Sequence, residues 1–130
     1  LFQMYSLLLL ISIPLLISAT PGPGGIQTLD VNDPTHMDKI WTGLSLINAV
    51  SDSPNYLVPV KVLSATSQVV SGMKYTWEVE MAETDCNKAN SNFDRNTCVA
   101  SANSPTSTYE LTLVTQEWLH QSQYSVVKIN

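Results

Sequence analysis

The chain of 130 residues has few charged residues, and its basic ones are scattered. It carries six lysine and arginine residues against eleven acidic ones, which gives a net charge of −5. A surface that binds nucleic acid needs clustered basic side chains to neutralise phosphates. No such cluster appears along this chain. The sequence therefore predicts that nucleic acid is not a partner.

Residues that hold metals or phosphate cofactors are also scarce. The two histidines, His36 and His120, are far apart in sequence, and neither has a nucleophile or carboxylate partner at motif spacing. We interpret both as surface histidines and predict that the protein is not an enzyme. The glycine-rich stretch PGPGG, residues 21–25, precedes no strand-then-helix pattern, and its prolines lack amide donors. We therefore predict no cofactor and no metal, and expect this stretch to form a flexible N-terminal arm.

The sequence has no hydrophobic run long enough to cross a bilayer comfortably. Its longest run, LLLLISIPLLI at residues 7–17, has eleven residues. That is the length of a signal-peptide core, and Ser18 and Ala19 supply the small residues of a cleavage site. We predict a signal peptide at residues 1–19 and a secreted domain at residues 20–130, without stable membrane association.

The two cysteines, Cys86 and Cys98, flank a polar segment with no evident means of burying itself. In a secreted protein an even number of cysteines is normally bridged. A metal site would need more ligands than Asp85, Asp94 and two distant histidines provide. We predict a disulfide, which would stabilise the fold by roughly 3 kcal/mol in the chain-entropy model.

One amphipathic helix is predicted at residues 34–50. Asp33 is a good N-cap and Pro34 suits the first helical position. Apolar residues then follow at three- and four-residue spacing: Met37, Ile40, Trp41, Leu44 and Ile47. Gly43 inside this helix costs about 1 kcal/mol relative to alanine, which makes sense if a sheet approaches closely there.

Strand patterns dominate the rest of the chain. They cover residues 56–66, 69–81, 108–115 and 124–129, and residues 26–33 form a short candidate strand before the helix. From Met73 to Met81 apolar and polar residues alternate, as in a half-buried strand. Strands without intervening helices must pair largely antiparallel. The predicted fold is α+β: one N-terminal helix wrapped by a twisted antiparallel sheet of four to five strands. Its strands are joined by hairpins at 67–72 and 116–123 and a disulfide-pinned excursion at 82–107.

Two valines, Val69 and Val70, lie inside the first predicted hairpin, next to the glycine that permits its turn. Apolar side chains at a loop tip are unfavourable in water and become favourable when a partner covers them. This part of the chain reads Gln68, Val69, Val70, Ser71, Gly72.

The order of these features resembles the cystatins, protein inhibitors of papain-like cysteine proteases. The Gln-x-Val-x-Gly motif of that family is matched by Gln68, Val70 and Gly72. The motif lies between two predicted strands, after a glycine pair and before a hairpin that contains a tryptophan. The resemblance extends over the whole chain after residue 19, and it implies a cystatin-like fold.

The resemblance also implies that this chain acts by binding alone and catalyses no reaction. An arm with Gly24 and Gly25, the hairpin residues 68–72 and Trp118 would form a wedge that enters the protease cleft. Inhibition would be reversible, competitive and tight, with cathepsin L-like and cathepsin B-like enzymes as targets. The inhibitor would be a monomer that can form a domain-swapped dimer through the hinge at 68–72.

Departures from the family pattern define an alternative. Glu117 stands where a proline usually precedes the tryptophan, and Tyr109 occupies the position of a cysteine of a second disulfide. After cleavage, the arm before Gly24 would contain only residues 20–23. The Ser-Asn-Asp motif by which some cystatins inhibit legumain is absent from residues 51–55. The alternative is a secreted cystatin-fold binding module, or the propiece of a larger precursor, with reduced or no protease inhibition.

Overall fold

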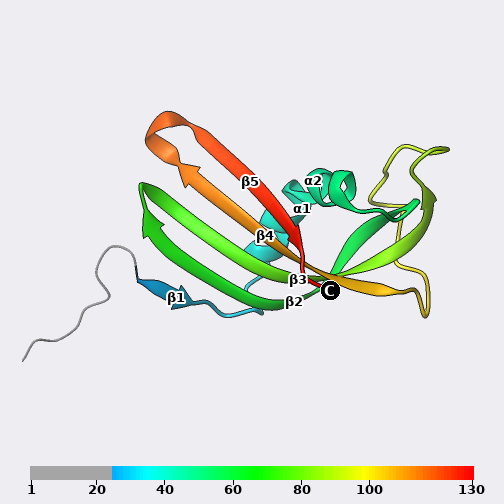
Figure 1. Ribbon diagram of the computed structural model, residues 1–130, viewed down its shortest axis with the longest axis horizontal. Coiled ribbons are helices and arrows are strands. Elements are labelled where there is room, and N and C mark those ends of the chain that lie inside the picture. Colours follow the sequence, from blue (N-terminus) through cyan, green and yellow to red (C-terminus); the bar gives the residue numbers. More distant parts are fainter. Residues whose placement is uncertain (1–24) are drawn as a thin grey trace, which may run out of the picture.

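The computed structural model describes residues 25–130, so the predicted signal peptide and Gly24 lie outside the described part. Five strands form one sheet in the order β1-β2-β3-β4-β5, and every neighbouring pair is antiparallel (Figure 1). The strands are β1 (Ile26–Thr28), β2 (Asn55–Val70), β3 (Gly72–Asn87), β4 (Thr106–Gln116) and β5 (Gln121–Lys128). The helices are α1 (Pro34–Thr42), α2 (Leu44–Val50) and the short 3-10 helix η1 (Glu117–Leu119).

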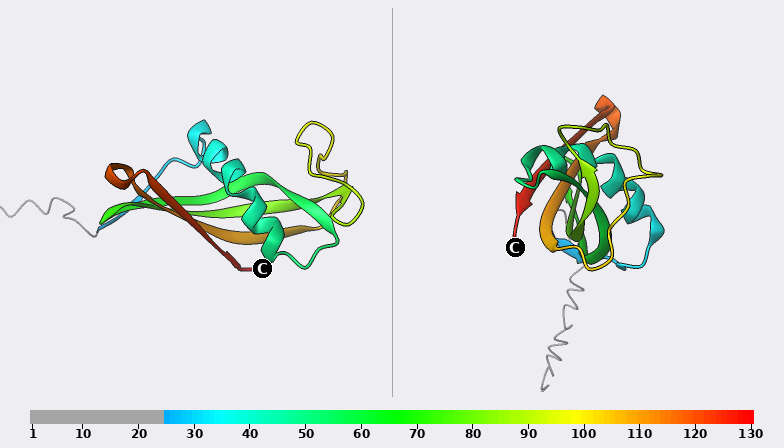
Figure 2. Two further views of the ribbon diagram at one scale, coloured as in Figure 1. Left: turned by 90° about the horizontal axis from the view of Figure 1, so that it is seen from above. Right: turned by 90° about the vertical axis from the view of Figure 1, so that its right-hand side faces the viewer.

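The helices α1 and α2 cross one face of the twisted sheet, and the core lies between the two layers (Figure 2). Strand β3 alternates as predicted, because Trp77, Val79 and Met81 are fully buried while Glu78 and Glu80 between them are not. The predicted α+β fold is therefore confirmed. The other main core residues come from β4 and the helices: Tyr109, Leu111, Leu113, Ile40, Leu44 and Ile47.

The single predicted helix is interrupted at Gly43. This residue has φ −87° and ψ 1°, so α1 ends and α2 begins there. A Cβ atom at position 43 would lie 2.8 Å from a ring carbon of Tyr124 on β5 and 3.2 Å from Leu111 on β4. The prediction that the sheet approaches the helix closely at Gly43 was correct, and α1 ends at this same point. Burial against this helix bend raises the pKa of the Tyr124 hydroxyl, which donates a hydrogen bond to Lys39 O at 3.0 Å.

The start of α1 forms as its sequence predicts. Asp33 Oδ1 accepts a hydrogen bond from Thr35 N at 3.0 Å and another from the Thr35 hydroxyl at 2.8 Å. These bonds favour the carboxylate and lower the pKa of Asp33. Asp33 is thus an N-cap with Pro34 at the first helical position.

Strands β2 to β5 are longer, and the connections between them shorter, than predicted, whereas β1 ends at Thr28 and is shorter than the predicted strand at 26–33. Strand β2 continues to Val70 and β3 begins at Gly72, so Ser71 alone separates them. The predicted hairpin turn at 67–72 is therefore too long. The excursion at 82–107 is likewise shortened, since β3 continues to Asn87 and β4 begins at Thr106. In the second hairpin, strand pairing already begins at Gln116 and Gln121. Pairing between neighbouring strands, which the local pattern does not encode, extends β2 to β5 beyond their predicted segments.

The prediction that both histidines lie on the surface is wrong for His36. This side chain is 4% exposed, and its Nδ1 accepts a hydrogen bond from Trp77 Nε1 at 3.0 Å. An indole nitrogen can only donate, so Nδ1 carries no proton and Nε2 does. The His36 Nε2 donates to Asp30 O at 2.9 Å. His36 therefore joins α1 to the central strand β3 and to the segment that leads from β1. His120 is exposed, as predicted.

Replacing His36 tests this link. His36→Ala leaves the buried indole N–H of Trp77 without its acceptor, and we expect the free energy of unfolding to fall by about 1–3 kcal/mol. Urea unfolding followed by circular dichroism measures the change. The matched control is His120→Asn, which removes an exposed histidine at a left-handed backbone position that asparagine also adopts, and it should shift stability by less than about 0.5 kcal/mol. Equal effects of the two substitutions would contradict the role of His36.

Candidate functional site

Three segments distant in sequence meet at one end of the sheet (Figure 1). The β2–β3 hairpin turns there at Ser71, and the β4–β5 hairpin turns there through η1. Strand β1 begins at the same end, because Ile26 pairs with Gln68 near the end of β2. We call this end of the molecule the hairpin edge.

The hairpin edge exposes large apolar side chains from all three segments. Trp118 is 62% exposed and Val69 and Val70 are 50% and 40% exposed, as expected for side chains that do not fold inward. Ile26 and Leu119, at 70% and 52%, belong to the same edge. A group of exposed apolar residues on a small protein indicates an interaction site. Ile26 and Leu119 were not among the predicted site residues, although they lie next to Gly25 and Trp118, which were.

Gly72 determines how tightly the first hairpin can turn. Its φ is +114°, a conformation that residues with a Cβ rarely adopt. A Cβ atom at this position would also lie 2.1 Å from Thr115 O on the neighbouring strand β4. Glycine is therefore required both for the backbone conformation and for the close approach of β4.

The second hairpin is built without the proline that the family pattern favours. Glu117 begins η1 and is exposed, like Trp118 and Leu119 after it. His120 ends η1 in the left-handed conformation with φ 49°, and its N–H donates to Glu117 O at 3.0 Å. Gln116, just before η1, donates from Nε2 to Ser71 O at 2.9 Å. This hydrogen bond connects the two hairpins directly.

Most of the predicted site residues therefore lie at one edge. Ser71 and Gly72 make the turn, Val69 and Val70 precede it, and Gln68 is half-buried beside Ile26. The others at this edge are Gly25 and Trp118, whereas Gly24 lies outside the described residues.

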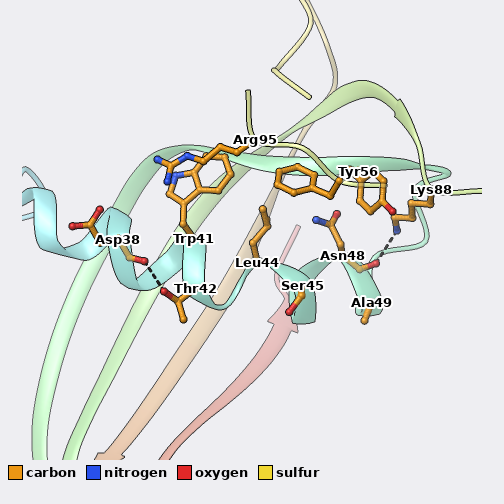
Figure 3. A pocket seen from close by; sticks show the side chains of 11 residues that line it. Asp38, Trp41, Thr42, Leu44, Ser45, Asn48, Ala49, Tyr56, Lys88 and Arg95 are labelled. Carbon is orange, nitrogen blue, oxygen red and sulfur yellow. Dashed lines mark hydrogen bonds between the residues drawn. The ribbon is translucent and has the colours of Figure 1, made fainter. Parts of the chain in front are cut away.

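The predicted disulfide between Cys86 and Cys98 is present, at the other end of the sheet. The loop that it closes borders a cavity of about 670 Å³ between the loop and the two helices (Figure 3). Residues from the helices line one side of this cavity, including Trp41, Leu44 and Asn48, and Tyr56, Phe93 and Arg95 line the other.

The side chains around this cavity anchor the disulfide loop. The Arg95 guanidinium lies 3.9 Å from the centre of the Trp41 ring, and the Phe93 ring is 5.5 Å from that of Tyr56. Lys88 Nζ donates to Asn48 O at 2.8 Å and to Ser51 O at 3.0 Å, at the end of α2. The expectation that this segment cannot bury itself is therefore wrong, since Phe93 packs against the core. The segment is polar overall, but three of its side chains hold it in place: the aromatic Phe93 and the long cationic side chains of Lys88 and Arg95.

The described residues include no group of three or more histidine, cysteine or acidic side chains placed to hold a metal ion. Within residues 25–130, no helix has the length and apolar character needed to cross a membrane. Asp33, whose pKa is lowered, and Tyr124, whose pKa is raised, belong to the helix and its packing rather than to the hairpin edge.

Two hairpins and an N-terminal strand of this α+β domain converge on one edge with exposed apolar side chains, an arrangement that indicates an interaction surface. The family profile of the cystatin domain matches residues 24–128. The chain belongs to the cystatin family, whose members are generally inhibitors of cysteine proteases.

Individual cystatins are similar to this chain over different lengths. Cystatin-1 of Chilobrachys guangxiensis is 32% identical over 112 residues, which cover 85% of this chain and 84% of that protein. Cystatin-1 of Crotalus adamanteus is 38% identical over 87 residues. The match with that protein covers 67% of this chain and 62% of the relative, so the chain spans less than two thirds of its length.

Solved structures agree on the fold. The crystal structure of Al-CPI superposes with a TM-score of 0.69 at 28% identity, covering 82% of this chain and all of that one. The salivary cystatin of the soft tick Ornithodoros moubata superposes with a TM-score of 0.67 at 20% identity, covering 83% of this chain and 99% of that one. At that identity the second likeness concerns the fold alone.

The turn at Gly72 provides a test of the hairpin geometry. Gly72→Ala places a Cβ against Thr115 O in an unfavourable backbone conformation, and we expect it to destabilise the protein by roughly 1–3 kcal/mol. Urea midpoints measure the loss, and amide chemical shifts of β3 and β4 locate it. Ser71→Ala, at the adjacent position, is the control and should leave the midpoint within about 0.5 kcal/mol of the original. An unchanged Gly72→Ala midpoint would show that the turn tolerates a side chain.

Proposed function

We propose that this protein is a reversible, competitive, tight-binding inhibitor of papain-like cysteine proteases, including cathepsin L-like and cathepsin B-like enzymes. The observation that carries the proposal is the exposure of Val69 and Val70 beside a turn of one residue. Trp118 of the second hairpin is exposed at the same edge. Membership of the cystatin family supports the same function.

The apolar side chains of the hairpin edge supply the binding energy in this proposal. Val69, Val70 and Trp118 together could bury on the order of 300 Å² of apolar surface, worth roughly 7 kcal/mol before the costs of association. Ile26 and Leu119 add to this surface. Strand pairing holds the hairpins, so little flexibility is lost on binding.

The proposed mechanism is occlusion of the active-site cleft. Gln68, Ser71 and Gly72 keep the first hairpin in shape, and Val69 and Val70 contact the cleft. Trp118 covers the side where the leaving group departs, and the arm at Gly24 and Gly25 enters the substrate-side subsites. No scissile bond reaches the catalytic cysteine of the protease, so the inhibitor is released intact.

We also propose that the inhibitor is secreted after removal of residues 1–19. The motivation is the hydrophobic run at residues 7–17 followed by Ser18 and Ala19. Protein expressed in a eukaryotic secretion host should appear in the medium, and N-terminal sequencing should begin at or near Thr20. A product that stays in the membrane and keeps residues 7–17 would contradict this.

A charge at Val70 separates an interface from a core position. Val70→Asp would bury an unpaired carboxylate in the protease cleft, and we expect the inhibition constant for papain to rise on the order of a thousandfold. The urea midpoint should hardly change, because Val70 is 40% exposed in the free protein. A collapsed midpoint would instead assign Val70 to the core.

A matched control is available on the same strand. Val60, at an irregularity in the β2–β3 register, is 44% exposed and lies far from the hairpin edge. Val60→Asp should leave the inhibition constant unchanged, which excludes a general effect of added charge. If the original protein shows no inhibition at micromolar concentration, the inhibitor proposal fails. Glu117 in place of proline would then favour a cystatin-fold binding module or a propiece.

A further inference from the structure

The two hairpins of the hairpin edge lie on neighbouring strands, but their tips project beyond the last paired residues. The β3–β4 ladder reaches Met73 and Thr115 at this end. Ser71 and the residues of η1 lie beyond that pair. Backbone pairing of β3 with β4 therefore does not by itself set the separation between Val70 and Trp118.

The Gln116 side chain spans the gap between these tips. Its Nε2 donates to Ser71 O at 2.9 Å, within the usual range for such a bond, and lies 3.5 Å from Ser71 Oγ. Ser71 is the single residue that separates β2 from β3, and Gln116 is the last residue before η1. One hydrogen bond thus joins the turn of the first hairpin to the entrance of the second.

The identity of residue 117 makes the hydrogen bond between Gln116 and Ser71 more important for the second hairpin. A proline at position 117 would fix its own φ and restrict residue 116 to extended conformations. Glu117 imposes neither restriction, so the backbone entering η1 depends on other contacts. The amide of Gln116 provides such a contact from outside the second hairpin.

We propose that Gln116 is a positioning residue that holds the two hairpins of the wedge at a fixed separation before the protease binds. This inference rests on the proposed inhibitory function. The constraint lowers the ordering cost of association, because both apolar tips are already arranged for one cleft. Gln116 itself need not touch the protease, since it acts through Ser71.

Two substitutions of similar size separate the hydrogen bond from packing. Gln116→Met keeps the length of the side chain but removes the donor. Gln116→Glu keeps the shape and, when ionised, offers only acceptors to Ser71 O, whereas its protonated form regains a donor. Gln123→Met is the control, because Gln123 is an exposed glutamine on β5 that pairs with Val114 in the β4–β5 ladder.

The first measurement is amide hydrogen exchange of Ser71 and Gly72 by NMR. We expect Gln116→Met and, at pH 7, Gln116→Glu to speed exchange at these residues severalfold, although the substitution lies on the other hairpin. The urea midpoint should stay near that of the original protein. Exchange unchanged in both variants would overturn the proposal whether or not the original protein inhibits a protease.

The second measurement is the inhibition constant for papain. We expect both variants to weaken inhibition about tenfold at pH 7, mainly through faster dissociation, while Gln123→Met has no effect. Relative to the original protein at each pH, Gln116→Glu should recover toward pH 4 and Gln116→Met should not. Faster exchange without weaker inhibition would overturn the positioning role. Absence of inhibition by the original protein would instead overturn the proposed function, while the exchange result still decides whether Gln116 couples the hairpins.

Discussion

The fold depends on how the indole N–H of Trp77 is satisfied at the centre of the core. Trp77 has no exposed surface, so its N–H must have an acceptor within the protein. His36 Nδ1 is that acceptor, and its other nitrogen then binds Asp30 O. One tautomer of one histidine thereby connects β3, α1 and the segment after β1. The segment that follows β1 is thus tied to the same residue that fills the core.

The sequential order of the strands explains why the apolar segments share one end. In an antiparallel sheet without crossovers, successive turns alternate between the two ends. The β2–β3 and β4–β5 turns therefore fall together, and the disulfide loop between β3 and β4 falls at the opposite end. Strand β1 runs antiparallel to β2, so the chain enters from the end where β2 finishes. The topology alone thus collects the arm and both hairpins at the hairpin edge.

The two ends of the sheet are stabilised by different means. The hairpin edge relies on backbone pairing, the close approach at Gly72 and the Gln116 bond, which leaves its apolar side chains exposed. The opposite end uses a disulfide, aromatic contacts of Phe93 and the cations Lys88 and Arg95 to hold a long polar loop. Tyr109, where the family resemblance would place a cysteine, is 1% exposed and packs in the core. An aromatic side chain therefore occupies that position without a second bridge.

The sequence alone determined the features that depend on neighbouring residues in the chain. Alternation from Met73 to Met81 established the central strand, Asp33 and Pro34 established the helix start, and Gly72 established the turn. Other features depended on partners distant in the chain, which no local period encodes. The helix breaks at Gly43, where the Tyr124 ring lies close; His36 is buried because Trp77 needs an acceptor; and Ile26 joins the edge because β1 pairs with β2. Periodicity records which face of an element is apolar, but only packing decides which residues meet across it.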